Sequence, residues 1–507
     1  MSEPRDRRAN VRFDAAAFIV VAVVVTARVV RLGTAPAEWY GDMSTLYEYV
    51  LEMRAGGHPP GLYLLGVGPL YPMILRPFLW LLGDSYLALK WTAVFFSLLG
   101  LALLFRFGRE LAGRWVALVA VAIGGTMSWW LVFSRLGDVQ ALTPPLTIAT
   151  MYATMLAVRS RQRWLLHALA GGLSVLGLYV YGNTFVLPVI VAVALFVAWR
   201  QRRIGAAQLA IATGGALVCA LPMLVESLHE TDVVFNGHTG QHFVGFRKLP
   251  AALVRGFGEA LWAYVGDGDK NFRANPDGMA HIGPLLLVFT LLGIAWWLQA
   301  PRRRQGVFLL GSFLLLHLPS VLVGTAEVPS ASRTVAAAPL LALFAAAGVV
   351  QVAESARRWG PRAVATVAIV SVLAIATTEL HRYMSRYLPG LPYGNTGIAA
   401  AITIYANALD PTVDVYMVGV GWLESMPELK SVRYTVEHPE RVFEVAPEAF
   451  DCAALRAIPQ PAVLLWDFQA DLPTTLLAEC RDQLRSPTTI TFGGKPVFRT
   501  AGLSLEP

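Results

Sequence analysis

The chain has 507 residues, of which 55% are hydrophobic and only 15% are charged, and its formal net charge is +7. This composition excludes a water-soluble globular protein and indicates a polytopic membrane protein. The positive charge does not indicate nucleic-acid binding, because the arginines are spread over short loops instead of being gathered on one patch.

The hydrophobic residues form runs of about the 20 residues that a helix needs to cross a bilayer. The first run is not followed by a small-residue cleavage site, so we expect it to remain as a helix. The fifth and sixth runs are separated only by the short turn Tyr179–Asn183. We predict about eleven crossings, at 15–32, 86–107, 115–134, 141–158, 164–181, 184–200, 205–224, 281–299, 306–324, 333–351 and 362–379.

Arginine clusters alternate with these runs, two runs lying between each cluster and the next. Arginine and lysine in short loops stay on the cytoplasmic side of a membrane. We therefore expect a cytoplasmic N-terminus, an extracytoplasmic C-terminal tail, and insertion in the bacterial cytoplasmic (inner) membrane. The clusters are Arg5/Arg7/Arg8/Arg12, Arg106/Arg109/Arg114, Arg159/Arg161/Arg163, Arg200/Arg202/Arg203, Arg302/Arg303/Arg304 and Arg357/Arg358/Arg362.

Two long loops, at about 33–85 and 225–280, fall on the predicted outer side. Met43–Arg54, Tyr71–Leu82 and Leu249–Val265 have apolar residues at near-helical spacing, which indicates short helices lying at the membrane interface. The polar run Gly266–Gly278 has the composition of turns.

From about Asn395 the hydropathy falls and a small α/β domain is predicted outside the membrane. The chain is therefore expected to consist of a transmembrane domain at 1–380 and an extracytoplasmic α/β domain at 381–507. Cys452 and Cys480 fall in the second domain, where an oxidising compartment would allow a disulfide, whereas Cys219 lies in an apolar run. The expected strands are Val413–Val418, Ser431–Val436, Ala462–Trp466 and Thr488–Phe492, with helices at Thr396–Ala408 and Thr474–Leu484.

Asp42 lies a few residues beyond the predicted outer end of the first crossing. It is either a solvated loop residue or a partly desolvated carboxylate beside Trp39, Tyr40 and Tyr47. Desolvation would raise its pKa, which suits a general base acting on a hydroxyl.

Several short motifs follow one another along residues 20–350. In order and sidedness they resemble the GT-C membrane glycosyltransferases, in particular the branch of protein O-mannosyltransferases and lipid A aminoarabinose transferases. One departure is Met43, which stands where the family often has Glu after the loop Asp; Glu48 is a candidate replacement. The motifs are Arg28 to Asp42 with Tyr47, Ala88-Leu-Lys90, Phe107-Gly-Arg109-Glu110, Phe133-Ser-Arg-Leu-Gly-Asp138, Gly177-Leu-Tyr-Val-Tyr181, and Pro329-Ser-Ala-Ser-Arg333 through Pro339.

The resemblance implies an inverting glycosyltransferase that moves a hexose or pentose from a polyprenyl-phosphate donor to an acceptor hydroxyl at the extracytoplasmic face. The departing phosphate gains negative charge and needs cations nearby. Arg333 is the first candidate, because a guanidinium can bind phosphate through two hydrogen bonds. Lys270 and Arg273 are the next candidates. A helix-end anchor for Arg333, and solvated loop charges for the other two, remain open alternatives.

Asp138 is the second candidate catalytic acid. It would line the acceptor side, or it would form a local ion pair with Arg135. Arg135, Tyr181, Glu48 and His58 are possible substrate-binding residues, and His58 is equally a surface loop histidine. His317, inside a crossing, is expected to form a hydrogen bond between helices.

No recognised metal or nucleotide motif occurs, and His229, His238, His242 and Asp232 do not have the spacing of a known metal site. A phosphate leaving group can be stabilised by side-chain cations, so no cofactor is required, although a divalent cation is possible. The expected partners are the lipid donor, a lipid, glycan or protein acceptor, and membrane lipids. The alternatives are a transporter or flippase of lipid-linked or small polar molecules, and a sensory or scaffold protein whose outer domain does the work.

Overall fold

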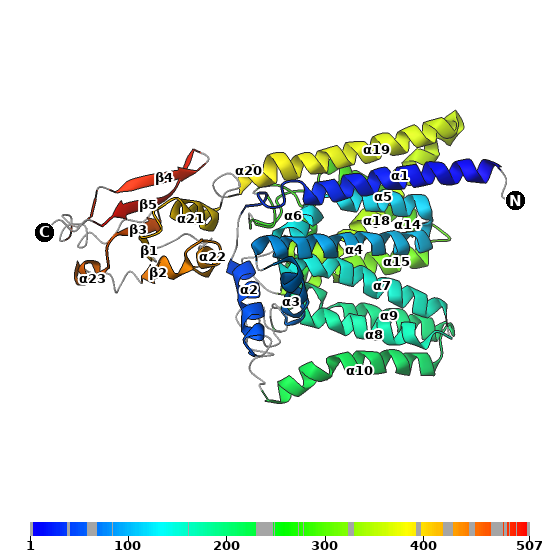
Figure 1. Cartoon of the computed structure of the whole chain (residues 1–507). Coiled ribbons are helices and arrows are strands. Elements are labelled where there is room, and N and C mark those ends of the chain that lie inside the picture. The colour runs from blue at the N-terminus through cyan, green and yellow to red at the C-terminus, as the bar shows by residue number, and fades with distance from the viewer. Residues whose placement is uncertain are drawn as a thin grey trace.

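The computed structural model describes residues 4–37, 41–57, 68–83, 85–160, 162–229, 247, 249–271, 273–276, 278–322, 329–391, 397–418, 429–445, 452–467, 480, 484–485, 487–492 and 494–503. A long helical bundle forms one part of the molecule, and a small α/β domain stands at one end of it (Figure 1). The N-terminus lies at the opposite end of the bundle (Figure 1).

The bundle helices run roughly along one axis, and short loops reverse the chain between them (Figure 1). Backbone polar groups cannot be left unpaired in lipid, so an apolar run of this length has to form a helix. The bundle helices are α1 (Pro4–Val29), α4 (Tyr86–Ala112), α5 (Arg114–Thr126), α6 (Ser128–Leu136), α7 (Thr143–Arg159), α8 (Trp164–Leu176), α9 (Leu187–Arg200), α10 (Ala206–His229), α14 (Pro284–Leu298), α15 (Arg303–Leu315), α16 (Leu318–Leu322), α17 (Ala331–Thr334), α18 (Ala338–Ser355) and α19 (Pro361–Arg382).

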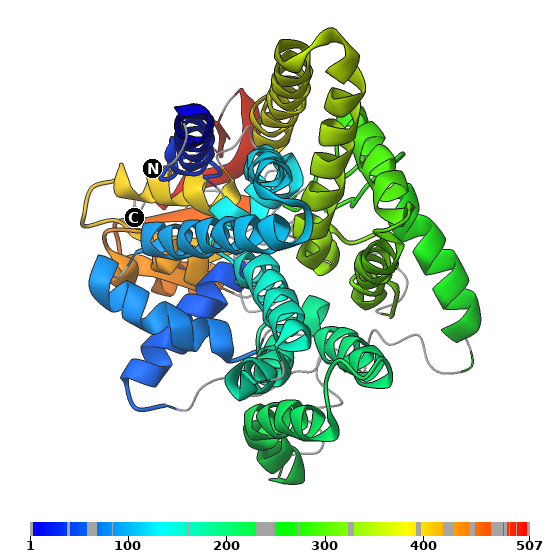
Figure 2. The same cartoon turned by 90° about the vertical axis from the view of Figure 1, so that its right-hand side faces the viewer.

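Every predicted crossing coincides with a helix in the structure. Among the described residues seven helices are long and apolar enough to span a membrane, or eight when the bent pair α5 and α6 counts as one span. The three other predicted crossings fall on α1, α8 and α14, so their passage through the bilayer stays a prediction. Helix α10 is only 6% buried along its apolar window and lies at the periphery of the bundle (Figure 2), where its apolar side chains face the membrane.

Helices α14 and α18 pack backbone against backbone. A Cβ atom on Gly293 would overlap the carbonyl oxygen of Phe344, and one on Gly348 would overlap that of Phe289. Small residues at such crossings allow the close approach that drives helix association in lipid. This contact positions α18, which follows the segment that carries Arg333.

We expect Gly348→Leu to destabilise the bundle by about 1–3 kcal/mol or more, because overpacking forces the two helices apart. The matched control is Gly311→Leu on α15, where an added Cβ would meet nothing within 4 Å. Thermal unfolding of both variants in detergent would test this. Equal melting temperatures for the two would contradict the close packing.

The third predicted crossing is broken. Helices α5 and α6 meet at an angle of 62° at Met127. The break leaves the first N–H groups of α6 without helical partners. Glu379, which is buried on α19, accepts hydrogen bonds from Ser128 N at 3.0 Å and Ser128 Oγ at 2.7 Å, and from Gly283 N at 2.6 Å. One carboxylate therefore caps α6 and also the start of α14.

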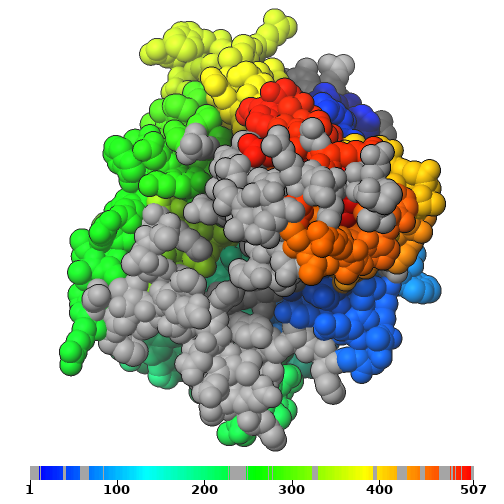
Figure 3. Space-filling view, turned by 90° about the vertical axis from the view of Figure 1, so that its left-hand side faces the viewer, coloured from blue at the N-terminus to red at the C-terminus, as the bar shows by residue number. Residues whose placement is uncertain are grey.

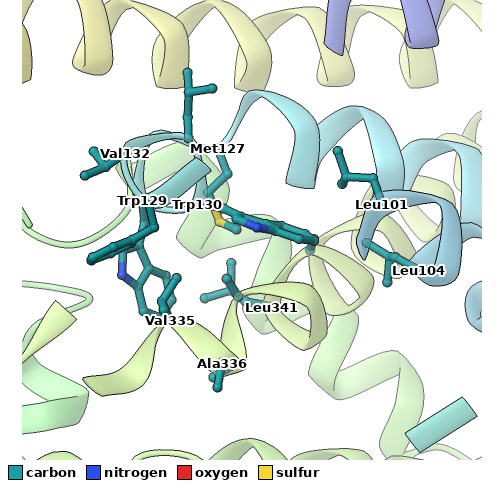
Figure 4. Close-up of a cluster of buried hydrophobic side chains, with 14 of the residues drawn as sticks. Leu101, Leu104, Met127, Trp129, Trp130, Val132, Val335, Ala336 and Leu341 are labelled. Atoms are coloured by element: carbon teal, nitrogen blue, oxygen red, sulfur yellow. The ribbon is translucent and has the colours of Figure 1, made fainter. Parts of the chain in front are cut away.

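The side chains of α6 fill the centre of the bundle beside this break. Trp129 and Trp130 point from α6 toward Val335 and Leu341, which belong to the segment around α17 and α18 (Figure 4). Trp129 Nε1 donates to Ala331 O at 3.1 Å. This packing holds the chain around Ala331 in place at the end of the bundle.

Three further helices occupy the two long loops, as predicted: α2 (Gly41–Arg54), α3 (Leu70–Leu82) and α13 (Leu249–Trp262). In Figure 1, α2 runs across the end of the bundle instead of along it. This orientation agrees with the predicted interfacial helix, and it places the start of α2 beside α22 (Leu429–Arg433) of the C-terminal domain.

The C-terminal domain contains a five-stranded sheet with the order β2-β1-β3-β5-β4. Strand β1 pairs in parallel with β2 and β3, whereas β5 pairs antiparallel with β3 and β4. One face packs against α21 and α22 and the other against α23. The elements are α21 (Ile398–Asn407), β1 (Asp414–Val418), α22 (Leu429–Arg433), β2 (Val442–Val445), α23 (Cys452–Ala457), β3 (Ala462–Asp467), β4 (Thr488–Phe492) and β5 (Lys495–Gly502).

The predicted α/β domain is confirmed, with one strand wrong. Ser431–Val436 was expected as a strand because of its β-branched residues, but the structure has the end of α22 and a turn there. Ser431 is buried against Ser44 of α2, and Val432 is buried in the core that includes the sheet. Strands β2 and β5 were not predicted. Cys452 and Cys480 form the expected disulfide, with Cα atoms 5.9 Å apart. Most of the helix expected at Thr474–Leu484 lies outside the described residues.

Candidate active site

Asp42 and Arg273 form an ion pair at the end of the bundle that carries the C-terminal domain. Asp42 lies in the first turn of α2, where the helix dipole favours a carboxylate. Its Oδ2 atom is 3.2 Å from Arg273 Nη1. The side chain of Asp42 is 63% exposed, so of the two alternatives the solvated carboxylate is confirmed and the desolvated one is wrong. Trp39 and Tyr40, expected beside it, lie outside the described residues.

The loop that carries Arg273 is organised around the buried carboxylate of Asp269. Asp269 Oδ1 accepts a hydrogen bond from Asn271 N at 2.8 Å, and Oδ2 accepts one from Ala331 N at 2.7 Å. Asp269 therefore ties the loop to the start of α17, which contains Arg333. Asp269 was not predicted as a site residue, although the repeated Asp, Gly and Asn of this run are typical of loops held by side-chain to backbone hydrogen bonds.

Asp138 lies in the two-residue link between α6 and the following 3-10 turn. Gly137 before it has φ +86°, and an added Cβ would crowd Leu89 and Lys90 at 3.0 to 3.1 Å, so a glycine is required. Asp138 Oδ1 accepts a hydrogen bond from Val139 N at 2.6 Å. When the Gln140 amide is oriented to donate, its nitrogen lies 2.7 Å from Asp138 Oδ2.

Asp138, and not Asp42, is the desolvated carboxyl group of the site. Burial raises the pKa of Asp138 to about 7, the negative charge of Asp42 raises it further, and the Val139 hydrogen bond and the charge of Arg273 oppose the rise. Asp42, Asp138 and Arg273 are therefore close enough to interact electrostatically. A carboxyl group with a pKa near neutrality suits proton transfer.

Tyr181 lies near both Asp138 and Arg333. It lies in the break between α8 and α9, in an extended conformation. Its hydroxyl group lies close enough to Arg333 and Asp138 to interact with the charges of both. Arg333 itself is half-buried in α17, and Ser330 Oγ caps this helix by accepting from Arg333 N at 3.4 Å. The structure thus brings together Asp42, Arg273, Asp138, Tyr181 and Arg333.

Arg135 turns away from this group. Its fully buried guanidinium donates to Ala27 O at 2.7 Å, Val30 O at 2.8 Å and Ala35 O at 2.7 Å. The local ion pair with Asp138 is therefore wrong, because Arg135 is committed to the carbonyl groups at the end of α1. Lys90, also buried, donates to Leu32 O at 3.2 Å and to Pro36 O. These two cations hold the segment that leads from α1 toward Asp42.

Lys270 is exposed on the Asp269 loop. Glu48 is half-buried on α2, about 240° around the helix axis from Asp42. His58 lies outside the described residues. His317 forms the expected buried hydrogen bond, 2.7 Å from Nε2 to Tyr264 Oη.

The second long loop contains four residues of types that can bind a metal, His229, Asp232, His238 and His242. His238, His242 and Asp232 lie outside the described residues, as does the side chain of His229. Within the part of the chain that the structure describes, no group of three or more His, Cys, Asp or Glu side chains could hold a metal ion.

Part of the sequence matches a known protein family. Residues 62–225 match the family model of dolichyl-phosphate-mannose-protein mannosyltransferases. This match covers less than half of the chain. No curated protein sequence matches the chain significantly.

Solved structures match over almost the whole length. The crystal structure of ArnT from Cupriavidus metallidurans bound to undecaprenyl phosphate aligns with a TM-score of 0.57 and 15% identity, covering 95% of this chain and 97% of ArnT. The apo form of the same protein aligns with a TM-score of 0.55 over 96% of this chain and 97% of ArnT. An Archaeoglobus fulgidus oligosaccharyltransferase in complex with Zn and sulfate aligns with a TM-score of 0.50 and 13% identity, covering 95% of this chain and 72% of that one. This chain therefore has the fold of the GT-C superfamily of membrane glycosyltransferases, as its motifs predicted.

Proposed function

We propose that this chain is an inverting glycosyltransferase that moves a sugar from a polyprenyl-phosphate donor to an acceptor hydroxyl at the extracytoplasmic membrane face. The observation that carries the proposal is the meeting of Asp42, Asp138, Arg273 and Arg333 at one end of a GT-C bundle. Two carboxylates can accept a proton, and two guanidinium groups can stabilise a phosphate, so both halves of the reaction have candidate groups.

On the donor side, Arg333 binds the phosphate and stabilises the charge that develops on it as the glycosidic bond breaks. Arg273 and Lys270, on the neighbouring loop, are secondary candidates. The ArnT structure, which has the same fold, contains undecaprenyl phosphate, a lipid of the required chemistry. Side-chain cations suffice for this step, while a divalent cation, as in the zinc complex of the archaeal enzyme, is a possible addition.

On the acceptor side, Asp42 is the proposed base. Its carboxylate is exposed, so an acceptor can reach it from outside, and Arg273 fixes its orientation. The hydroxyl oxygen bonds to the anomeric carbon, its proton passes to Asp42, and the electron pair of the broken bond leaves with the phosphate. Attack opposite the leaving group inverts the configuration. Asp138 and Tyr181 contact the acceptor beside it.

The sidedness of the bundle supports an extracytoplasmic site. The N-terminus and the C-terminal domain lie at opposite ends of the bundle (Figure 1). Two contacts link chain segments that carry the predicted cytoplasmic arginine clusters. Arg159 pairs with Glu110 at 2.8 Å, and Arg114 lies over the ring of Phe13 at 4.9 Å. With those clusters in the cytoplasm, the site and the C-terminal domain face outward from the bacterial inner membrane.

The deciding experiment supplies purified protein in detergent with radiolabelled polyprenyl-phosphate sugars, covering mannose, arabinose and related pentoses. Acceptors are serine- and threonine-containing peptides, lipid headgroups and glycans. Transfer of label to one acceptor class is expected. Movement of intact donor across proteoliposome membranes without any transfer would instead support the transporter reading.

We expect kcat/KM to rise as the pH rises through about 7, because the pKa of Asp138 is raised to about 7. Below this pH the carboxyl group is protonated and is a weak acceptor for the hydrogen bond from the acceptor hydroxyl, whereas above it the carboxylate is a strong acceptor. Activity is therefore lost on the acid side. Measuring kcat/KM of the wild type and of Asp138→Asn across the pH range would check this. If the variant still loses activity below the same pH, the loss does not come from protonation of Asp138.

A further inference from the structure

Helix α2 is held on the side opposite Asp42 by the C-terminal domain. Ser44 and Tyr47 lie about 200° and 140° around the helix axis from Asp42. Ser44 is completely buried, and its Oγ atom lies 2.7 Å from Ser431 Oγ of α22 and 2.5 Å from Tyr86 Oη at the start of α4. A single hydroxyl therefore connects α2 with both parts of the protein.

An aromatic contact lies one turn further along the same face. The ring of Tyr47 packs edge-on against Tyr434, directly after α22, with ring centroids 5.0 Å apart and an interplanar angle of 78°. On its other side Tyr47 contacts Tyr86, with centroids 6.0 Å apart. In Figure 3 the orange surface of the C-terminal domain lies directly beside the blue surface of the N-terminal region.

The C-terminal domain holds α22 firmly. Val432 is fully buried in the core that includes α21 and the sheet. Thr435 Oγ1 lies 2.6 Å from Thr403 Oγ1 on α21, and Arg433 Nε donates to Val442 O at 3.2 Å at the start of β2. The position of α22, and so of the α2 face that contacts it, is set by the folded domain.

The partner of Asp42 is tied to the same part of the chain. Tyr387 lies in the π-helical turn Tyr383–Tyr387 that follows α19 and leads toward the C-terminal domain. Its buried hydroxyl donates to Arg273 O at 2.7 Å. Both members of the Asp42–Arg273 pair therefore depend on contacts from the C-terminal third of the chain.

We infer that the C-terminal domain is a positioning element of the active site, and that Ser431 and Tyr434 orient α2 so that Asp42 meets Arg273. This inference rests on the proposed transferase function. Misplacing a reacting group by about 1 Å can cost about a hundredfold in rate. The contacts that Ser431 and Tyr434 make with α2 are with Ser44 and Tyr47 and not with Asp42, so we assign both as positioning residues.

The test uses full-length protein and the label-transfer assay. Tyr434→Ala and Ser431→Ala/Tyr434→Ala are expected to lower kcat about tenfold to a hundredfold with little change in donor KM. Tyr434→Phe, which keeps the ring, should restore near wild-type kcat. The matched control is Tyr405→Ala, because Tyr405 makes a similar edge-on contact at 5.3 Å with Phe498 inside the same domain. It should lower the melting temperature without lowering kcat below the melting range.

A second measurement does not depend on activity. In a Cys219→Ala background, the pair Ser44→Cys/Ser431→Cys should form a disulfide under mild oxidation, detected by mass spectrometry of the joined peptides. Failure to cross-link in folded protein, or wild-type kcat in both Tyr434→Ala and the double variant, would overturn the inference. If the cross-link forms efficiently but the wild-type protein transfers no sugar from any polyprenyl-phosphate donor, the proposed function is refuted. The contact between α22 and α2 would then exist without a role in sugar transfer.

Discussion

Asp42→Asn is expected to lower kcat by at least about a hundredfold, the size typical of losing a general base. The amide is nearly the same size but does not accept the hydroxyl proton. It also removes the negative charge that helps to raise the pKa of Asp138. The residual activity should therefore show its acid limb at lower pH than wild type. Label transfer measured across the pH range gives both results.

The control for Asp42→Asn is Glu52→Gln, a change to an exposed carboxylate ten residues along the same helix. It should leave kcat and the acid limb unchanged, and size-exclusion profiles should match for all proteins. Wild-type turnover in Asp42→Asn would eliminate Asp42 as the base. Loss of activity in both variants would instead indicate that activity depends on the integrity of α2 in general and not on the Asp42 carboxylate.

Arg333→Gln is expected to lower kcat about a hundredfold to a thousandfold, because the departing phosphate loses a cation where its charge develops. Arg333→Lys should recover only part of this loss, since an ammonium group lacks the paired hydrogen bonds of a guanidinium. The donor KM should change less than kcat, because the interaction strengthens in the transition state. Steady-state kinetics with varied donor concentration measures both quantities.

Arg357→Gln serves as the control for Arg333. Arg357 is exposed and pairs with Glu354 at 3.8 Å after α18, so its loss should not affect turnover. Lys270→Gln provides a graded comparison, because Lys270 is exposed on the loop beside the site and should have a smaller effect than Arg333. A larger loss in Lys270→Gln than in Arg333→Gln would reassign the phosphate contact to the loop.

The helices of the bundle could be predicted because their signal is local. An apolar run such as Pro361–Arg382 has to pair its backbone groups internally, whatever its neighbours are. The helix α2 and the strand β1 were predicted from their own spacing in the same way. The strand expected at Ser431–Val436 was wrong because the conformation of this segment is decided by contacts of Ser431 with α2 and of Val432 with the core of the domain, and not by the strand preference of its β-branched residues.

The partners of individual polar groups could not be predicted from spacing. Arg135 and Asp138 are three residues apart, yet Arg135 binds carbonyl groups about a hundred residues earlier in the chain. Asp269 and Ala331 are joined by a hydrogen bond across 62 residues, and Glu379 and Ser128 across 251. Such pairs form only when packing brings distant segments together, and no local pattern marks them.

By itself, the sequence determined the helical bundle, the α/β domain and the end of the bundle at which Asp42, Asp138 and Arg333 gather, because hydropathy and arginine placement are local properties that the membrane sorts directly. Only the tertiary structure decided that Asp138 is the desolvated carboxylate, that Asp42 is exposed and paired with Arg273, and that the C-terminal domain contacts α2. Desolvation and ion pairing depend on which groups surround a carboxylate in space, and here those groups come from segments far apart in the chain.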